Sequence, residues 1–89
     1  MDISYAISTF ARTVAKVAYT YTKNVPDAED ISQEVFIALM NSGKDFESDE
    51  HLKAWLIRVT INASIDINRQ YKNKKETELE DNENYYFEK

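Results

Sequence analysis

The sequence predicts an all-α domain, a bundle of three or four helices. The chain has 89 residues but only one glycine and one proline, which is too few for the many tight turns of a β fold. Apolar residues recur every three or four positions in three segments, as they do along one face of a helix. Short polar stretches separate these segments. A chain of this length forms a single domain with a modest core, because it buries only about 60% of its unfolded surface.

The first expected helix covers about residues 3–22. Its apolar positions are spaced by four, three, four, three and four residues, which places them on one stripe of an amphipathic helix. They are Ile3, Ile7, Phe10, Val14, Val17 and Tyr21. The segment 23–26, which contains the proline, ends the helix. The stripe is therefore predicted to face the core.

The second expected helix runs from about Asp27 to Met40. Asp27 is a suitable N-cap, because a carboxylate there accepts from free amides and complements the helix dipole. The predicted core stripe is Ala28, Ile31, Val35 and Leu39, with Ala38 beside it. Gly43 follows as the expected left-handed end of the helix.

The third expected helix covers about residues 51–75, after a polar loop at 44–50. Its core side comprises Leu52, Leu56, Val59, Ala63 and Ile67, with Trp55 at the edge. A separate line of Ile57, Ile61 and Ile65 suggests burial on a second side. The segment 55–61 is rich in β-branched residues, but it does not alternate polar and apolar residues, so a helix is favoured over a strand.

Charge divides the chain into two parts. The net charge is −5, and residues 76–89, with six acids and one lysine, account for all of it. We therefore expect residues 1–75 to form the helical domain, and 76–89 to be an acidic flexible tail or the start of an interdomain linker. Within the neutral body, residues 58–75 carry five bases and one acid, a local basic stretch.

Several classes of protein are not expected. The chain has no apolar run of 18 residues, so no membrane span or membrane partner is predicted. It begins without a signal-peptide pattern and has no cysteine, which indicates a cytoplasmic protein without disulfides. The single histidine, His51, lies where the third helix should start and is interpreted as a helix-start residue. No cofactor, metal site or catalytic residue is predicted.

A polar and basic stripe lies on the third helix, apart from its core side. Its members are Arg58, Asn62, Ile65, Arg69 and Lys72, spaced by four, three, four and three residues. Arginine and lysine there would neutralise phosphates, and the amide of Asn62 could read a base edge. A solvated helix face would show the same pattern, so the stripe alone leaves both interpretations open.

The second helix carries a polar ridge of Asp30, Gln33 and Glu34 that ends at Ile37. Beside this ridge, Phe36 and Met40 form a pair four residues apart. An acidic ridge flanked by apolar side chains suits docking of a basic partner helix. In the simpler alternative, the acids are merely solvated, and Phe36 and Met40 belong to the core.

Two motifs resemble region 2 of the sigma-70 family, in particular its extracytoplasmic-function group. Residues 27–37, DAEDISQEVFI, are similar to the family's AEDLxQExF segment. Residues 55–62, WLIRVTIN, followed by Asp66 and Arg69, are similar to WLxRIxxN…D…R. Phe46 between the motifs also fits the family's loop. The resemblance covers about residues 5–75, and both motifs lie on predicted helices.

The resemblance implies a role for each face. The second helix would bind the clamp helices of the β′ subunit of core RNA polymerase through Asp30, Gln33, Glu34, Phe36, Ile37 and Met40. The third helix and its preceding loop would hold the non-template strand of the promoter −10 element, melted to single strand. The implied DNA-binding residues are Phe46, Arg58, Asn62, Arg69, Lys72, Lys74 and Lys75. Asn62 would help to receive a flipped-out base, whereas Trp55 would mainly pack.

Alternatives to this function remain open. The family's second domain, which reads the −35 element, has no counterpart in these 89 residues, so the chain is either one domain of a longer protein or a naturally truncated relative. A sigma-like interaction module, binding polymerase or an anti-sigma factor without touching DNA, is the main alternative. An enzyme is a third hypothesis, although no catalytic constellation supports it.

Overall fold

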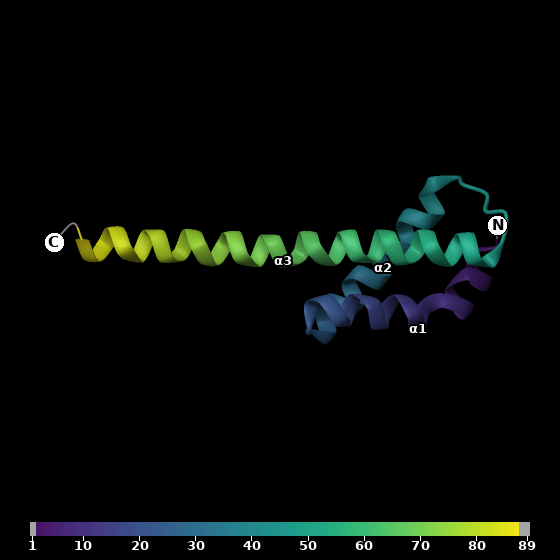
Figure 1. The fold of residues 1–89 in the computed structure, drawn as a ribbon, viewed down its shortest axis with the longest axis horizontal. Helices are drawn as coiled ribbons and strands as arrows, with labels where there is room; N and C mark the ends of the chain where they lie inside the picture. The colour runs from purple at the N-terminus through teal and green to yellow at the C-terminus, as the bar shows by residue number, and fades with distance from the viewer. Residues whose placement is uncertain (1, 88–89) are drawn as a thin grey trace.

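The structure is a computed structural model that describes the backbone of residues 2–87 and the side chains of residues 2–75. The described backbone forms three helices and no strand: α1 (Ile3–Thr22), α2 (Val25–Ser42) and α3 (Asp49–Phe87). This confirms the predicted all-α class. Figure 1 shows that α1 and α3 run side by side in the same direction and that α2 crosses behind α3. The C-terminal half of α3 projects beyond the other two helices (Figure 1).

The helix boundaries follow from local capping. The Asp2 carboxylate accepts hydrogen bonds from the amides of Ser4 and Tyr5 at the start of α1, and Lys23 closes that helix in the left-handed conformation, with φ of 54°. Gly43, with φ of 63°, ends α2 as predicted, because glycine adopts this conformation without steric cost. At the start of α3, the Ser48 hydroxyl accepts from the amide of His51.

The start of α2 differs from the prediction. The N-cap is Asn24, whose side-chain oxygen accepts from the Asp27 amide at 3.0 Å, so α2 begins before Asp27 rather than at it. Pro26 therefore lies in the first helical turn instead of in a break before the helix. A proline is tolerated there because amides in the first turn have no partner within the helix.

The core centre on α1 also differs from the prediction. The apolar spacing predicts Ile7 and Tyr21 in the core, but each is 41% exposed. The buried residues are Ala6, Phe10, Val14 and Ala18, which follow one another at intervals of four. Ridges of this spacing interdigitate in the commonest class of helix packing, and alanine lets the helices approach closely. The spacing of the large apolar residues alone does not show that Ala6 and Ala18 are buried.

On α3, too, the buried row of residues differs in part from the predicted one. Leu52 and Leu56 are buried as predicted, and the row continues with Thr60 and Ser64, each with no exposed area. Thr60 donates its hydroxyl proton to the Leu56 carbonyl at 2.6 Å, and Ser64 donates to the Thr60 carbonyl at 2.8 Å. These bonds remove the cost of burying unpaired hydroxyls. The predicted Val59, Ala63 and Ile67 are only partly buried and pack against the edge of the core.

The end of α3 lies further along the chain than predicted. The helix continues to Phe87, whereas the sequence pattern predicts an end near Lys75. Two side-chain hydrogen bonds near its middle tie α3 to its neighbours. The Asn68 amide donates to the Tyr21 carbonyl at 2.9 Å, and the Tyr71 hydroxyl donates to the Asp27 carboxylate at 3.2 Å. The predicted acidic flexible tail, 76–89, lies outside the residues whose side chains are described.

Candidate functional site

One candidate surface is the outer face of α2. Asp30, Gln33 and Glu34 are exposed, and with Ile37 and Met40 they fall within about 120° around the helix, at 100° per residue. The buried residues of α2, centred on Ile31, Val35 and Leu39, lie on the opposite side. We name the surface formed by Asp30, Gln33, Glu34, Ile37 and Met40 the α2 face.

The α2 face combines acids with apolar side chains. Ile37 is 54% exposed and Met40 is 61% exposed, which is unusual for side chains whose burial is worth roughly 1.5–3 kcal/mol. The α2 segment contains no lysine or arginine. Asp30 and Met40 are ten residues apart, so the α2 face is about 15 Å long. Such a surface suits a basic helix that also carries apolar residues.

Phe36 does not belong to the α2 face. Its side chain is 7% exposed and lies in the hydrophobic core, as in the simpler alternative drawn from the sequence. Met40, its predicted pair, is exposed instead. Around the helix Phe36 lies about 100° from Ile37, close to the core side. Phe36 therefore supports α2 from within and offers little area to a partner.

The second candidate surface is the outer stripe of α3. Arg58, Asn62 and Arg69 are exposed and Ile65 is partly buried. These four positions, together with the exposed Lys72, lie within about 80° around the helix. We name this group of five residues the α3 stripe. From Arg58 to Arg69 it extends for about 16 Å. No carboxylate among residues 2–75 forms an ion pair with Arg58 or Arg69.

Lys74 and Lys75 are exposed but do not share this line. Lys74 lies about 160° around the helix from Arg58 and Lys75 about 100° from it. Both follow Tyr71, which contacts Asp27 of α2. They lie where α3 begins to project beyond α1 and α2 (Figure 1).

The loop between α2 and α3 is held against Trp55. The ring of Phe46 packs edge-on against Trp55, with 5.8 Å between ring centroids. The ammonium of Lys44 lies 6.0 Å from the Trp55 centroid, within the range of a cation–π contact. Trp55 thus packs, as the resemblance implies, and it also fixes the loop that carries Phe46.

A hollow of about 440 Å³ lies beside this loop. It is lined by Tyr5, Asp45, Phe46, Glu47, Ser48, Asp49 and Leu52. The Tyr5 hydroxyl donates to the Asp49 carboxylate, so α1 braces the start of α3 next to the hollow. This hydrogen bond is the largest cause of a raised pKa of the Tyr5 phenol. Asn62 lies ten residues beyond Leu52, about 15 Å along α3.

Some of these contacts were not foreseen from the sequence. The spacing of apolar and polar residues predicts no role for Lys44, Tyr5 or Tyr71. Lys44 makes a cation–π contact, and each tyrosine donates a hydrogen bond to a carboxylate on another helix. Tyr71 and Asp27, for example, are separated by 44 positions. The hydrogen bond to Asp27 is the largest cause of a raised pKa of the Tyr71 phenol. Ile57, Ile61 and Ile65 are partly buried, in keeping with a second covered side.

The described part of the chain offers no cluster of three metal-ligating side chains. Among the same residues, no helix is both long and apolar enough to cross a bilayer. The two candidate surfaces are exposed helix faces of opposite charge.

The fold is thus a three-helix domain with an acidic exposed face on α2 and a basic exposed stripe on α3. Comparison with protein families is more specific: the model of Sigma-70 region 2 matches residues 6–74. The chain therefore belongs to the sigma-70 region 2 family. The resemblance to sigma-70 region 2 that the two motifs indicate is confirmed, and one relative described next carries the extracytoplasmic-function name.

Three relatives illustrate the similarity. RNA polymerase sigma factor NccH of Alcaligenes xylosoxydans xylosoxydans is 34% identical over 58 residues, which cover 65% of this chain and 31% of NccH. ECF RNA polymerase sigma factor SigE of Mycolicibacterium smegmatis is 35% identical over 60 residues, covering 67% of this chain and 23% of SigE. RNA polymerase sigma factor SigV of Bacillus subtilis is 32% identical over 57 residues, covering 64% and 34%.

The matched region spans between 23% and 34% of the length of these three relatives. No solved structure gives a significant match.

Proposed function

We propose that this domain acts in bacterial transcription initiation as an adaptor between core RNA polymerase and melted promoter DNA. The α2 face docks on the clamp helices of the β′ subunit, and the α3 stripe with the Phe46 loop holds the non-template strand of the −10 element. The observation that carries the proposal is the presence of two separate exposed faces, acidic on α2 and basic on α3, in a member of the sigma-70 region 2 family.

The α2 face supports docking through its composition. Asp30 and Glu34 attract a basic helix, and Ile37 and Met40 offer apolar area that is released from water on binding. Gln33 lies between them and can donate and accept hydrogen bonds. Phe36 is left out of the contact set because it is buried.

The α3 stripe supports binding of a single strand. Arg58, Arg69 and Lys72 are spaced to follow a phosphate backbone, and Asn62 stands among them with both a donor and an acceptor for a base edge. Extruding a base costs a few kcal/mol of stacking, which phosphate contacts along the stripe would offset. Lys74 and Lys75 would extend the positive field beyond the bundle.

Exposure of the stripe supports this function. Arg58, Asn62 and Arg69 are all exposed, as contact with DNA requires. The proposed adaptor role requires no covalent chemistry and assigns none.

The test is assembly of the two proposed complexes. The full chain is first titrated with a purified β′ clamp-helix fragment, and the complex is then offered a pool of random single-stranded oligonucleotides. We expect saturable binding to the fragment and enrichment of a short shared sequence in the bound oligonucleotides. Binding to the fragment without enrichment would instead favour the interaction module. A folded chain that binds neither would overturn the proposal.

A further inference from the structure

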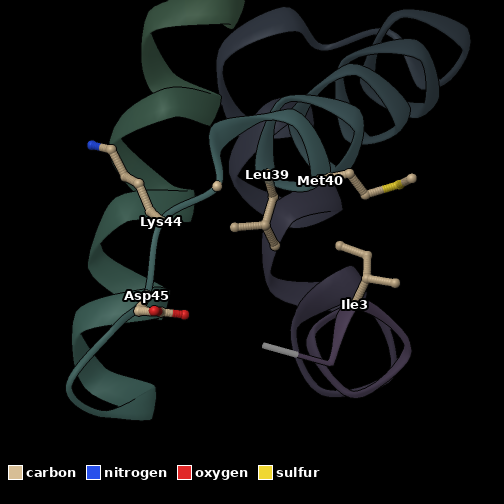
Figure 2. A pocket seen from close by; sticks show the side chains of 6 residues that line it. Ile3, Leu39, Met40, Lys44 and Asp45 are labelled. Carbon is tan, nitrogen blue, oxygen red and sulfur yellow. The ribbon is translucent and has the colours of Figure 1, made fainter.

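A hollow of about 330 Å³ lies at the end of the α2 face. It is bordered by the start of α1, the last turn of α2 and the following loop, and its lining residues are Ile3, Leu39, Met40, Gly43, Lys44 and Asp45. Figure 2 shows the apolar side chains of Ile3, Leu39 and Met40 around one side of it, with Lys44 and Asp45 across from them. Nothing in the two sequence motifs points to this hollow.

The chemistry of the hollow is apolar, with a negative rim. Leu39 is almost fully buried at its base, whereas Met40 is 61% exposed and leaves much of its apolar surface in water. In Figure 2 the Asp45 carboxylate points toward the hollow and the Lys44 ammonium points away from it, consistent with the contact of Lys44 to Trp55. An incoming apolar group therefore meets apolar walls and a carboxylate at the edge.

Gly43 leaves the hollow open on one side. A Cβ built on Gly43 would meet no atom within 4 Å, and the residue has φ of 63°. The left-handed conformation favours glycine, so this wall consists of bare backbone. A partner can therefore approach the end of α2 closely.

The hollow is continuous with the α2 face through Met40, which belongs to both. A helix lying along the acidic residues of α2 would pass over Met40 and reach the hollow within about 15 Å of Asp30. The same partner would need basic residues to match Asp30, Glu34 and Asp45, because α2 carries no base. Charge and continuity thus indicate one occupant for the hollow and the face.

We propose that the hollow receives an apolar side chain of the basic partner helix that docks on the α2 face, with Met40 and Ile3 as its walls. The inference rests on the proposed function and adds to it an anchor outside the acidic ridge. Interface energy concentrates where an apolar side chain fills a pocket surrounded by polar contacts. The polar ridge of Asp30, Gln33 and Glu34 then orients the partner helix, and the hollow contributes much of the affinity for it.

The experiment measures the affinity of the full chain for the purified β′ clamp-helix fragment by calorimetry. Met40→Ala removes an exposed wall, and Ile3→Phe fills the hollow from α1. The matched controls are Val25→Ala and Val25→Phe, because Val25 is an equally exposed apolar residue (57%) at the opposite end of α2. Thermal melting establishes that each variant is folded. We expect Met40→Ala and Ile3→Phe to weaken binding roughly tenfold or more, and the Val25 variants to bind like the wild type.

A double-mutant cycle identifies the occupant. Each apolar residue of the fragment is changed to alanine and measured against wild type and Met40→Ala. We expect one fragment residue whose effect depends on Met40, because residues in direct contact are not additive. Additivity of every fragment residue with Met40 would overturn the proposal.

The outcomes separate this inference from the function on which it rests. If Glu34→Lys abolishes binding while Met40→Ala and Ile3→Phe bind like the wild type, docking on α2 stands and the hollow is not its anchor. If the wild type does not bind the fragment at all, the docking function fails and the proposed occupant fails with it. Self-association of the chain that Ile3→Phe abolishes would also overturn the inference, by assigning the hollow to a second copy.

Discussion

The α2 face and the α3 stripe are both outer faces of helices that bury their opposite sides in one core, yet their chemistry is opposite. The α2 face has acids and exposed apolar side chains and comes from a helix without any base. The α3 stripe has exposed arginines around an asparagine. One small core thus supports two surfaces of opposite charge, for which we propose different partners. If this comparison is correct, each surface can be damaged without damaging the other.

The largest expected effect is on the α2 face. Glu34→Lys should weaken binding to the β′ clamp-helix fragment by about 100-fold, because it places like charge against a basic partner. Glu29→Lys is the matched control: it makes the same charge change on the same helix, but about 140° around it from Glu34. Equal loss in both variants, measured by calorimetry, would mean that net charge rather than the α2 face governs binding.

The next effect is on the core that both surfaces share. Ala18 has no exposed area, so Ala18→Leu should overpack the contact between helices and lower the free energy of unfolding by about 1–3 kcal/mol. Ala38→Leu adds the same atoms at an exposed position of α2 and should change stability by less than about 0.5 kcal/mol. Urea denaturation measures both. A tolerated leucine at 18 would show that close packing by alanine is not required.

On the α3 stripe, substitutions of Asn62 and Arg69 should change different properties of DNA binding. Asn62→Ala should relax the preference for one base by roughly tenfold, because it removes a base-edge contact and no charge. The dependence of affinity on salt should stay as in the wild type. Fluorescence anisotropy with oligonucleotides that differ at single positions measures this. A changed salt slope without a changed base preference would place Asn62 outside the base contact.

The smallest effect concerns the tie between α3 and α2. The Tyr71 hydroxyl donates to Asp27, which raises the pKa of the phenol from its ordinary value of 10.0. The contribution of this bond to stability is therefore fully present below pH 10 and is lost as the pH rises through the raised folded-state pKa. Tyr71→Phe should be slightly less stable than the wild type at pH 7.

The pH dependence of the stability difference between wild type and Tyr71→Phe tests whether the hydrogen bond to Asp27 causes it. The gap in unfolding free energy between wild type and Tyr71→Phe should shrink as the pH rises above 10. Tyr19→Phe is the control, because the Tyr19 hydroxyl makes no hydrogen bond within residues 2–75. A gap that does not change with pH would assign the effect of Tyr71→Phe to packing.

Much of the fold could be predicted because it depends on local signals. The span of α1, the end of α2 at Gly43 and the helical nature of 55–61 follow from spacing and turn chemistry. The start of α2 was misplaced because Asn24 and Asp27 are both good caps, and only the backbone shows which one is used. The sequence pattern alone does not show which of these two residues caps α2.

The side of each helix that faces the core was less predictable. Large residues at helical spacing placed Ile7 in the core, whereas Ala6 and Ala18 occupy it. Buried Thr60 and Ser64 look polar in the sequence, yet each satisfies its hydroxyl within its own helix. Phe36 and Met40 were paired by spacing, but close packing admits only Phe36. Such choices depend on how the three helices fit together, which no single segment encodes.

The most direct test of two independent surfaces is a reciprocal measurement on two variants. Glu34→Lys and Arg69→Ala are each assayed for binding to the β′ clamp-helix fragment and to the selected single-stranded oligonucleotide. Glu34→Lys should lose the fragment and keep DNA. Arg69→Ala should keep the fragment and bind DNA more weakly, with a slope of log affinity against log salt lower by about 0.7, the loss of one phosphate contact. Equal loss of both activities in both variants would contradict the assignment of separate partners to α2 and α3.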